Sequence, residues 1–175
     1  MIKDELDKII RNIPDFPKEG INFKDITPLL LDSDISNYII DSFIDKLEGL
    51  NIDAIVGVES RGFLFGFLLA NKMGVPFIPA RKAGKLPGET VKYKYALEYG
   101  FAELEMHKSD VKKDWNILVH DDLLATGGTA CAAACLVNKL EANIVGFAFI
   151  VNLSFLKGNE RLLEYSNNII SLIDY

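Results

Sequence analysis

The segment from Asn116 to Ala130 constrains the fold of this chain more than any other. An apolar run ends in two adjacent carboxylates, Asp121 and Asp122, and a glycine-rich turn then leads into a run of small residues. This order predicts a strand, an acidic tip, a glycine loop and a helix. Backbone N–H groups at such a helix start have no partner inside the helix, and the helix dipole favours an anion beside them.

The glycine loop has the composition of an anion site. Gly127 and Gly128 carry no Cβ, so the backbone there can adopt positive φ and approach a phosphate closely. Thr126 and Thr129 add hydroxyl donors. The two acids narrow the ligand further, because an ionised carboxylate only accepts hydrogen bonds and can hold a vicinal diol. A phosphorylated ribose meets both demands, whereas an Asp-Asp pair alone is more typical of solvated acids at a strand end.

Strand-like and helix-like segments alternate along the chain. Helical spacing or apolar runs predict helices over Asp4–Asn12, Ile35–Leu47, Phe63–Met73 and Thr129–Leu140. The predicted strands are Ala54–Val58, Pro76–Pro79, Val91–Ala96, Ala102–His107, Trp115–His120, Ile144–Leu153 and Ile169–Ile173. Such alternation predicts a single α/β domain over residues 1–175, with a mostly parallel sheet flanked by helices.

A second strand-to-helix junction lies at Glu59–Gly62. In parallel sheets ligands bind beyond the carboxyl ends of the strands, so this junction and the acid pair should converge on one edge. Arg61 suits a diphosphate, because its planar guanidinium binds two oxygens at once. On its own, however, an arginine at a helix start is equally consistent with no ligand. The chain's basic cluster comprises Arg61, Arg81, Lys82 and Lys85.

Residues 81–103 contain Gly84, Pro87, Gly88 and Gly100 around a strand-like middle. This pattern predicts a mobile hairpin that closes over the site and excludes water. The alternative is a surface hairpin with solvated lysines.

Composition bounds the class of protein. The 175 residues are 49% apolar and 25% charged, as in a single globular domain, and the net charge of −6 argues against nucleic-acid binding. The longest apolar run is too short for a membrane span, and the N-terminus lacks an apolar signal region, so we expect a cytoplasmic protein. Cys131 and Cys135 are too few for a zinc site and are expected as reduced, packed thiols.

These motifs resemble those of the type I phosphoribosyltransferases. Val119–Thr129 looks like the loop that binds 5-phosphoribosyl 1-pyrophosphate (PRPP). Its sequence Asp-Asp-Leu-Leu-Ala-Thr-Gly-Gly-Thr resembles that of the branch of the family that acts on adenine. Further matches follow in family order at residues 13–28, 59–66, 81–88 with 95–100, and 152–158. The resemblance implies that adenine and PRPP are converted to AMP and pyrophosphate in purine salvage, with Mg²⁺ bound together with PRPP.

The resemblance also implies a role for each site residue. PRPP and AMP would bind at Asp121, Asp122, Ala125, Thr126, Gly127, Gly128 and Thr129. Pyrophosphate would bind at Glu59, Ser60, Arg61, Arg81, Lys82 and Lys85, with a cis peptide between Glu59 and Ser60. Arg61 and Glu98 would be catalytic, with Glu98 handling the proton at the purine N7, and Tyr99 would move with the hairpin. Basic residues in segment 81–85 would reach into the neighbouring site of a homodimer.

Base recognition is expected from a hood formed by residues 1–33. Phe23 would stack on adenine, backbone groups of Asn22 and Lys24 would read its edge, and Leu123 would pack on the other side. Asn22, Lys24 and Ala83 depart from residues common in the family. His120 stands where valine is common and should face the packing side of the sheet.

Two other functions are also consistent with the sequence. One is transfer to a different purine, and the other is a non-catalytic PRPP-sensing regulator. Regulators of this kind usually add a basic DNA-binding segment, for which this acidic chain has no room. Arg61, the hairpin and Glu98 favour chemistry, and the two adenine-like segments favour adenine.

Overall fold

The structure is a computed structural model that describes residues 2–96 and 100–175. Its elements are α1 (Ile2–Ile9), β1 (Arg11–Ile13), β2 (Phe23–Asp25), the 3₁₀ turn η1 (Thr27–Leu31), α2 (Ser33–Lys46), β3 (Ala54–Val58), α3 (Gly62–Met73), β4 (Phe77–Lys82), β5 (Thr90–Ala96), β6 (Phe101–His107), β7 (Asn116–Leu124), α4 (Gly128–Lys139), β8 (Asn143–Asn152), η2 (Ser154–Leu156), α5 (Gly158–Leu162) and β9 (Ile169–Asp174).

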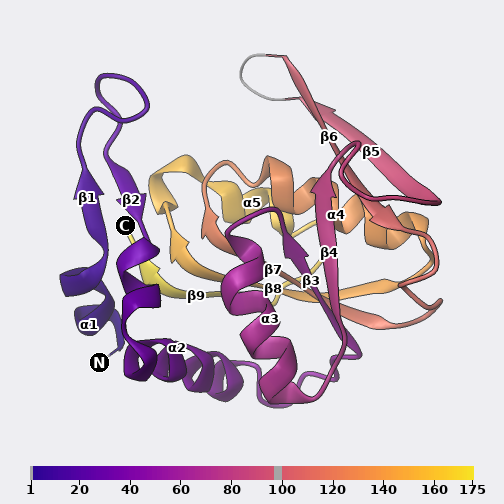
Figure 1. The fold of residues 1–175 in the computed structure, drawn as a ribbon, viewed down its shortest axis with the longest axis horizontal. Coiled ribbons are helices and arrows are strands. Elements are labelled where there is room, and N and C mark those ends of the chain that lie inside the picture. The colour runs from indigo at the N-terminus through magenta and orange to yellow at the C-terminus, as the bar shows by residue number, and fades with distance from the viewer. Residues whose placement is uncertain (1, 97–99) are drawn as a thin grey trace.

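A seven-stranded sheet in the order β5-β6-β4-β3-β7-β8-β9 organises the molecule (Figure 1). The adjacent strands β4, β3, β7, β8 and β9 pair in parallel. Strand β6 runs antiparallel to both β4 and β5. The expected α/β fold with a mostly parallel central sheet is confirmed. All five residues of β3 are buried, as a central parallel strand covered on both faces requires.

Helices cover both faces of this sheet and create two apolar cores. On one face, α4 packs Ala132, Ala133 and Leu136 against strand residues such as Val119 and Phe147. On the other face, α2 and α3 contribute Phe43, Phe65 and Leu69 to a core that includes Leu118 and Ile150. The carboxyl ends of β3 and β7 therefore open at one edge, between α3 and α4 (Figure 1).

The N-terminal segment forms a separate two-stranded sheet of β1 and β2, which periodicity did not predict because each strand is only three residues long. The connection between them contains a cis Phe16–Pro17 bond and Gly20 at φ 85°. Tyr175 at the C-terminus donates a hydrogen bond to Asp7 (2.7 Å), and Lys24 lies 3.4 Å from the centre of its ring.

Several boundaries differ from the prediction, and strand pairing explains two of them. The first helix ends at Ile9, because Arg11 already pairs with Asp25 in the small sheet. The strand predicted to end at His120 continues to Leu124, because β8 pairs with it to its end. The acid pair therefore lies inside β7. No helix in the described part of the chain is long and apolar enough to cross a membrane.

Candidate active site

The glycine loop between β7 and α4 is shaped by two close backbone approaches. Gly127 has φ 81°, and a Cβ there would lie 2.7 Å from the carbonyl oxygen of Gly158. A Cβ on Gly158, the first residue of α5, would meet the carbonyl oxygen of Ala125. Only glycine at both positions lets α5 pack against the loop in this way.

The backbone amides of this loop are available to a ligand. Within residues 2–96 and 100–175, no protein group accepts a hydrogen bond from the N–H groups of residues 125–129. A cavity of about 80 Å³ lies against them. It is lined by Asp121, Leu123, Leu124, Ala125, Thr126, Gly127, Gly128, Thr129, Ala130 and Phe149. Unpaired amides at the start of α4, facing a cavity, are the arrangement that binds a phosphate.

The two acids of β7 have different surroundings. Asp121 lines the cavity at the glycine loop, and its Oδ1 accepts a hydrogen bond from the Asp122 amide at 2.9 Å. Asp122 is buried, and its Oδ2 lies 3.0 Å from Nε of Arg61. That contact is an ion pair without hydrogen-bond alignment, so Oδ2 has no hydrogen-bond partner among the described residues.

Burial raises the pKa of both carboxyls. For Asp121 the charge of Asp122 adds to the effect of burial. For Asp122 the nearby Arg61 charge opposes it but does not outweigh it. Hydroxyl donors on a ligand would favour the ionised forms of both acids.

At the second junction, residues of the basic cluster surround Glu59 through side-chain and backbone contacts. The peptide between Glu59 and Ser60 is cis, as predicted, and α3 begins at Gly62 directly after Arg61. The carboxylate of Glu59 accepts hydrogen bonds from the Lys82 amide (2.9 Å) and from Nε of Arg81 (3.2 Å). Burial opposes ionisation, but these hydrogen bonds prevail and hold the pKa of Glu59 below its usual value.

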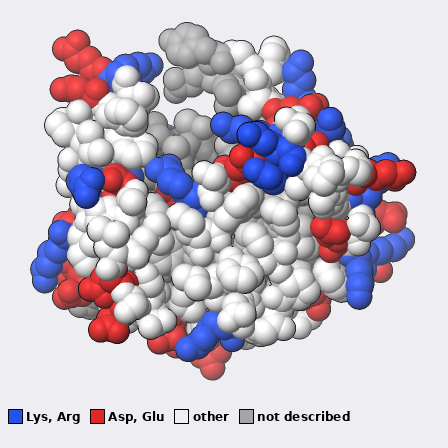
Figure 2. Space-filling model, viewed as in Figure 1, with Lys and Arg blue, Asp and Glu red and all other residues white. Residues whose placement is uncertain are grey.

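Lys85 joins the same cluster from the loop after β4. Its carbonyl oxygen accepts a long hydrogen bond from Nη1 of Arg81, at 3.4 Å. Its charge contributes to the lowered pKa of Glu59. In Figure 2, Lys and Arg side chains gather next to the hollow between the N-terminal elements and the hairpin. The basic residues named from the sequence thus converge on the edge that carries the glycine loop.

Of the predicted base contacts, Asn22, Phe23 and Lys24 lie on or just before β2. Leu123 lies on β7, where it lines the cavity at the glycine loop. The ring of Phe23 meets Phe16 edge-on at 5.2 Å, and the guanidinium of Arg61 lies 5.2 Å from the Phe23 ring centre. Asn22 is exposed just before β2. The Lys24 side chain turns away to bind Asn12 (2.6 Å). Arg61 therefore connects the expected base slot with Asp122.

Glu98 and Tyr99 fall outside the described residues. The hairpin strand leading to them places the Tyr95 hydroxyl 3.5 Å from Oγ1 of Thr129. Arg161 donates a hydrogen bond from Nη1 to the Thr126 carbonyl at 3.2 Å. Sequence reasoning named neither contact, because an isolated Tyr or Arg distant in sequence carries no motif. The run 152–158 did signal that Gly158 belonged with the family's motifs.

Comparison with known proteins agrees with this geometry. A family model described as the phosphoribosyl transferase domain matches residues 31–173, and the chain belongs to that family. It is 50% identical over 175 residues to the adenine phosphoribosyltransferase of Caldanaerobacter subterraneus subsp. tengcongensis, covering 100% of both chains. Within the family, the chain thus belongs to the adenine phosphoribosyltransferases.

Two solved structures are similar over nearly their whole length. The adenine phosphoribosyltransferase of Thermoanaerobacter pseudethanolicus is 48% identical with a TM-score of 0.95, covering 100% of both chains. The Saccharomyces cerevisiae enzyme, complexed with an imino-altritol bisphosphate and adenine, is 43% identical with a TM-score of 0.92, covering 98% of both chains.

Proposed function

We propose that this chain transfers the phosphoribosyl group of PRPP to adenine, giving AMP and pyrophosphate for purine salvage. The observation that carries the proposal is the row of unpaired amides at residues 125–129 beside Asp121. The amides would hold the 5-phosphate, and the two acids of β7 would accept hydrogen bonds from the ribose hydroxyls. The yeast relative, complexed with adenine and a sugar-like bisphosphate, supports the same pair of ligands.

The chemistry requires that the bond between ribose C1 and the diphosphate break as a bond from C1 to a base nitrogen forms. Arg61, Arg81, Lys82 and Lys85 would neutralise the departing charge. Neutralisation is strongest if these cations are already in place before the bond breaks. Glu59 holds the Arg81 cation through its Nε and the backbone at Lys82 through its amide.

Mg²⁺ is proposed to bind together with PRPP. Among the described residues, no group of three or more His, Cys, Asp or Glu side chains could hold a metal ion alone. This suits an ion that keeps several waters and binds largely through substrate oxygens. When bound it would neutralise diphosphate charge. Asp121, which lines the cavity, is the side chain proposed to contribute from the protein.

Base recognition and proton transfer complete the proposal. Residues 1–33 would form the hood, with Phe23 stacking on adenine, Asn22 and Lys24 contributing backbone contacts and Leu123 packing opposite. Residues 81–103 would act as the mobile hairpin that brings Glu98 and Tyr99 to the base. The position of Arg61 next to both Phe23 and Asp122 supports a base slot beside the ribose site.

A homodimer in the cytoplasm is the proposed working form. The outward face of α3 exposes Leu64 (40%), Phe67 (56%) and Leu68 (42%), and Figure 2 shows an uncharged surface below the basic cluster. Apolar patches of this kind mark interaction sites. Both cysteines are free, as expected in a reducing compartment. Phe67→Glu should turn a dimer into a monomer by light scattering, whereas an unchanged mass would contradict this interface.

The experiment for the reaction is a PRPP-dependent assay across adenine, hypoxanthine, guanine and xanthine, with Mg²⁺ and with excess chelator. We expect AMP from adenine in the presence of Mg²⁺ and loss of the activity with chelator. Turnover of oxopurines alone would assign another base, and binding of PRPP without any turnover would favour a sensor.

A further inference from the structure

Glu105 is a buried acid that the proposed reaction leaves unused. It lies in the middle of β6, directly opposite Arg81 on β4 and Lys92 on β5. Only 1% of its surface is exposed. An ionised carboxylate so deep in the protein is costly unless hydrogen bonds compensate for the lost water. Its partners therefore indicate what it is there to hold.

Those partners belong to the loop between β4 and β5. Oε1 of Glu105 accepts hydrogen bonds from the amides of Lys85 (2.8 Å) and Leu86 (2.9 Å). Oε2 accepts from the Thr90 hydroxyl (3.3 Å) and lies 3.7 Å from Nζ of Lys92. Burial opposes ionisation, but these contacts outweigh it and lower the pKa of Glu105. The carboxylate fixes two consecutive amides of a loop that otherwise has no regular structure.

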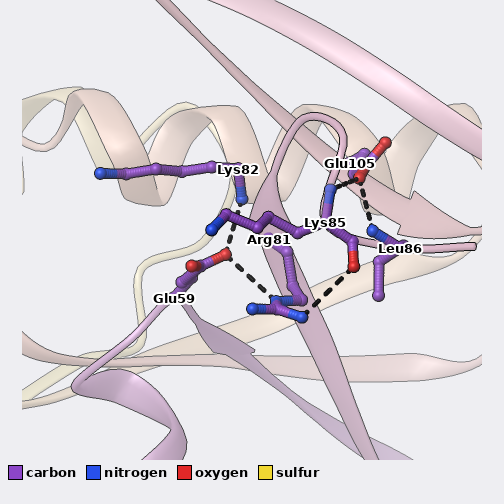
Figure 3. Close-up of polar contacts among 6 residues, drawn as sticks. All are labelled: Glu59, Arg81, Lys82, Lys85, Leu86 and Glu105. Carbon is purple, nitrogen blue, oxygen red and sulfur yellow. Dashed lines mark hydrogen bonds and ion pairs between the residues drawn. The ribbon is translucent and has the colours of Figure 1, made fainter.

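Figure 3 shows that the fixed loop carries Lys85 and directly follows Arg81 and Lys82, the last two residues of β4. Glu59 and Glu105 hold opposite ends of the segment Arg81–Lys85. Arg81 lies between them and donates one hydrogen bond to Glu59 and another to the carbonyl oxygen of Lys85. The Lys85 side chain returns over Arg81 toward Glu59, where its charge lowers the Glu59 pKa. The direction of that side chain depends on a backbone that Glu105 anchors.

We propose that Glu105 is a positioning residue, which holds the backbone at Lys85 and Leu86 so that Lys85 and Arg81 face the pyrophosphate of PRPP. The proposal rests on the proposed function, because it assigns the ligand of the basic cluster. Since β6 also forms one strand of the hairpin, Glu105 connects the loop that carries Lys85 to the hairpin. It touches no substrate, and it would act on pyrophosphate recognition and not on the base.

The test compares Glu105→Gln with Glu103→Gln in the full-length protein. Glu103 lies on the same strand, and its carboxylate makes no polar contact within the described residues. The amide of Gln keeps the shape but weakens both hydrogen bonds, because a neutral acceptor is roughly half as strong. For Glu105→Gln we expect the KM for PRPP and the inhibition constant for pyrophosphate to rise about tenfold, with the KM for adenine within about twofold. Glu103→Gln should match the parent.

A double-mutant cycle with Lys85→Ala separates positioning from general destabilisation. If Glu105 acts through Lys85, adding Glu105→Gln to Lys85→Ala should raise the KM for PRPP much less than it does in the parent. Fully additive effects, or equal changes in the KM values of adenine and PRPP, would overturn the proposal. So would a folded Glu105→Gln variant with parental values for both PRPP and pyrophosphate.

Amide hydrogen exchange on the unaltered protein supplies a test that does not depend on any variant folding. The Lys85 and Leu86 amides should exchange at least about tenfold more slowly than those of Gly84 and Gly88, and should slow further when pyrophosphate and Mg²⁺ are added. Exchange as fast as at the two glycines would refute the anchor. If the parent turned over no purine, the proposed reaction would fail, while this measurement would still decide the role of Glu105.

Discussion

The glycine loop and the basic cluster lie at the same edge of the sheet, but the hydrogen-bond donors that they offer to an anion differ in whether they already have protein partners. The amides of residues 125–129 have no partner among the described residues. On the other side, Arg61 is paired with Asp122, and Arg81 with Glu59. One region offers unpaired main-chain donors, and the other offers two arginine side chains that already have internal partners.

This difference matters because the two anions have different fates. The 5-phosphate stays on the sugar from substrate to product, so a rigid main-chain cradle can hold it throughout. Pyrophosphate must leave. Arginines that can return to their internal carboxylate partners would bind the leaving group and still release it. Changing either region alone should therefore give distinct kinetic signatures.

The largest effect, on PRPP affinity, is expected from Gly127→Ala, which distorts the loop whose main-chain amides have no protein partner. The positive φ costs roughly 1–2 kcal/mol for any residue with a Cβ, and that Cβ would lie 2.7 Å from the Gly158 carbonyl oxygen. The loop must then move, so PRPP affinity should fall by more than about a hundredfold. Isothermal titration measures it. Gly74→Ala has a similar φ of 69° but meets no atom within 4 Å. This control should lower stability and leave PRPP affinity unchanged, and equal losses in both variants would contradict the role of the loop.

Asp122→Asn should have the next largest effect on PRPP binding. It tests the region in which arginines have internal carboxylate partners. It removes the acceptor proposed for the ribose hydroxyls and the internal partner of Arg61. Loss of charged hydrogen bonds worth about 2 kcal/mol should raise the KM for PRPP roughly thirtyfold. The KM for adenine should change by less than about threefold. Asp53→Asn is the control, since Asp53 accepts from Asn116 at the opposite end of β7 (2.8 Å). Equal loss of adenine and PRPP binding would mean the acid has another role.

Acid should disturb both regions together, through His120 in the strand that carries the acid pair. Burial lowers its pKa to about 4, and both ring nitrogens lack partners among the described residues. The unfolded state therefore takes up a proton near pH 6.5 before the folded state does, so stability falls between about pH 6.5 and 4. The expected loss is about 2 kcal/mol at pH 5 relative to pH 8. Between pH 8 and pH 5, urea unfolding should show the parent losing about 2 kcal/mol more stability than His120→Val.

Phe23→Ala is expected to have the smallest effect and lies outside both anion regions. The substitution removes the stacking ring proposed for adenine, and should raise the KM for adenine about tenfold through lost aromatic contact. Because the Arg61 guanidinium lies 5.2 Å from this ring, PRPP binding should weaken slightly. Phe16→Ala, which removes the edge-on neighbour, should have a weaker effect on adenine. A larger change in PRPP than in adenine would contradict the assignment of the base slot.

The regular part of the fold was predictable from residue patterns, because buried strands such as Ala54–Val58 are short apolar runs between helices with clear periodicity. The extension of β7 through Asp121 and Asp122 was not, since it depends on pairing with β8. Neither were β1 and β2, whose pairing spans an irregular segment. Among site features, the convergence of Arg61 and the acid pair followed from topology, and their ion pair did not. The anchoring role of Glu105 had no signal, because a lone acid in an alternating strand is normally solvated.

The contact between Gly127 and Gly158 carries a consequence for how this protein can vary. Positions 127 and 158 are 31 residues apart in the sequence, yet a methyl group at 127 would displace the Gly158 carbonyl, and one at 158 would displace the Ala125 carbonyl in the glycine loop. Natural homologues that bear a larger residue at one position should show a compensating insertion, deletion or rerouted turn near the other. Any redesign of the chain's last quarter, including truncation or permutation there, should be checked first for its effect on sugar-phosphate affinity.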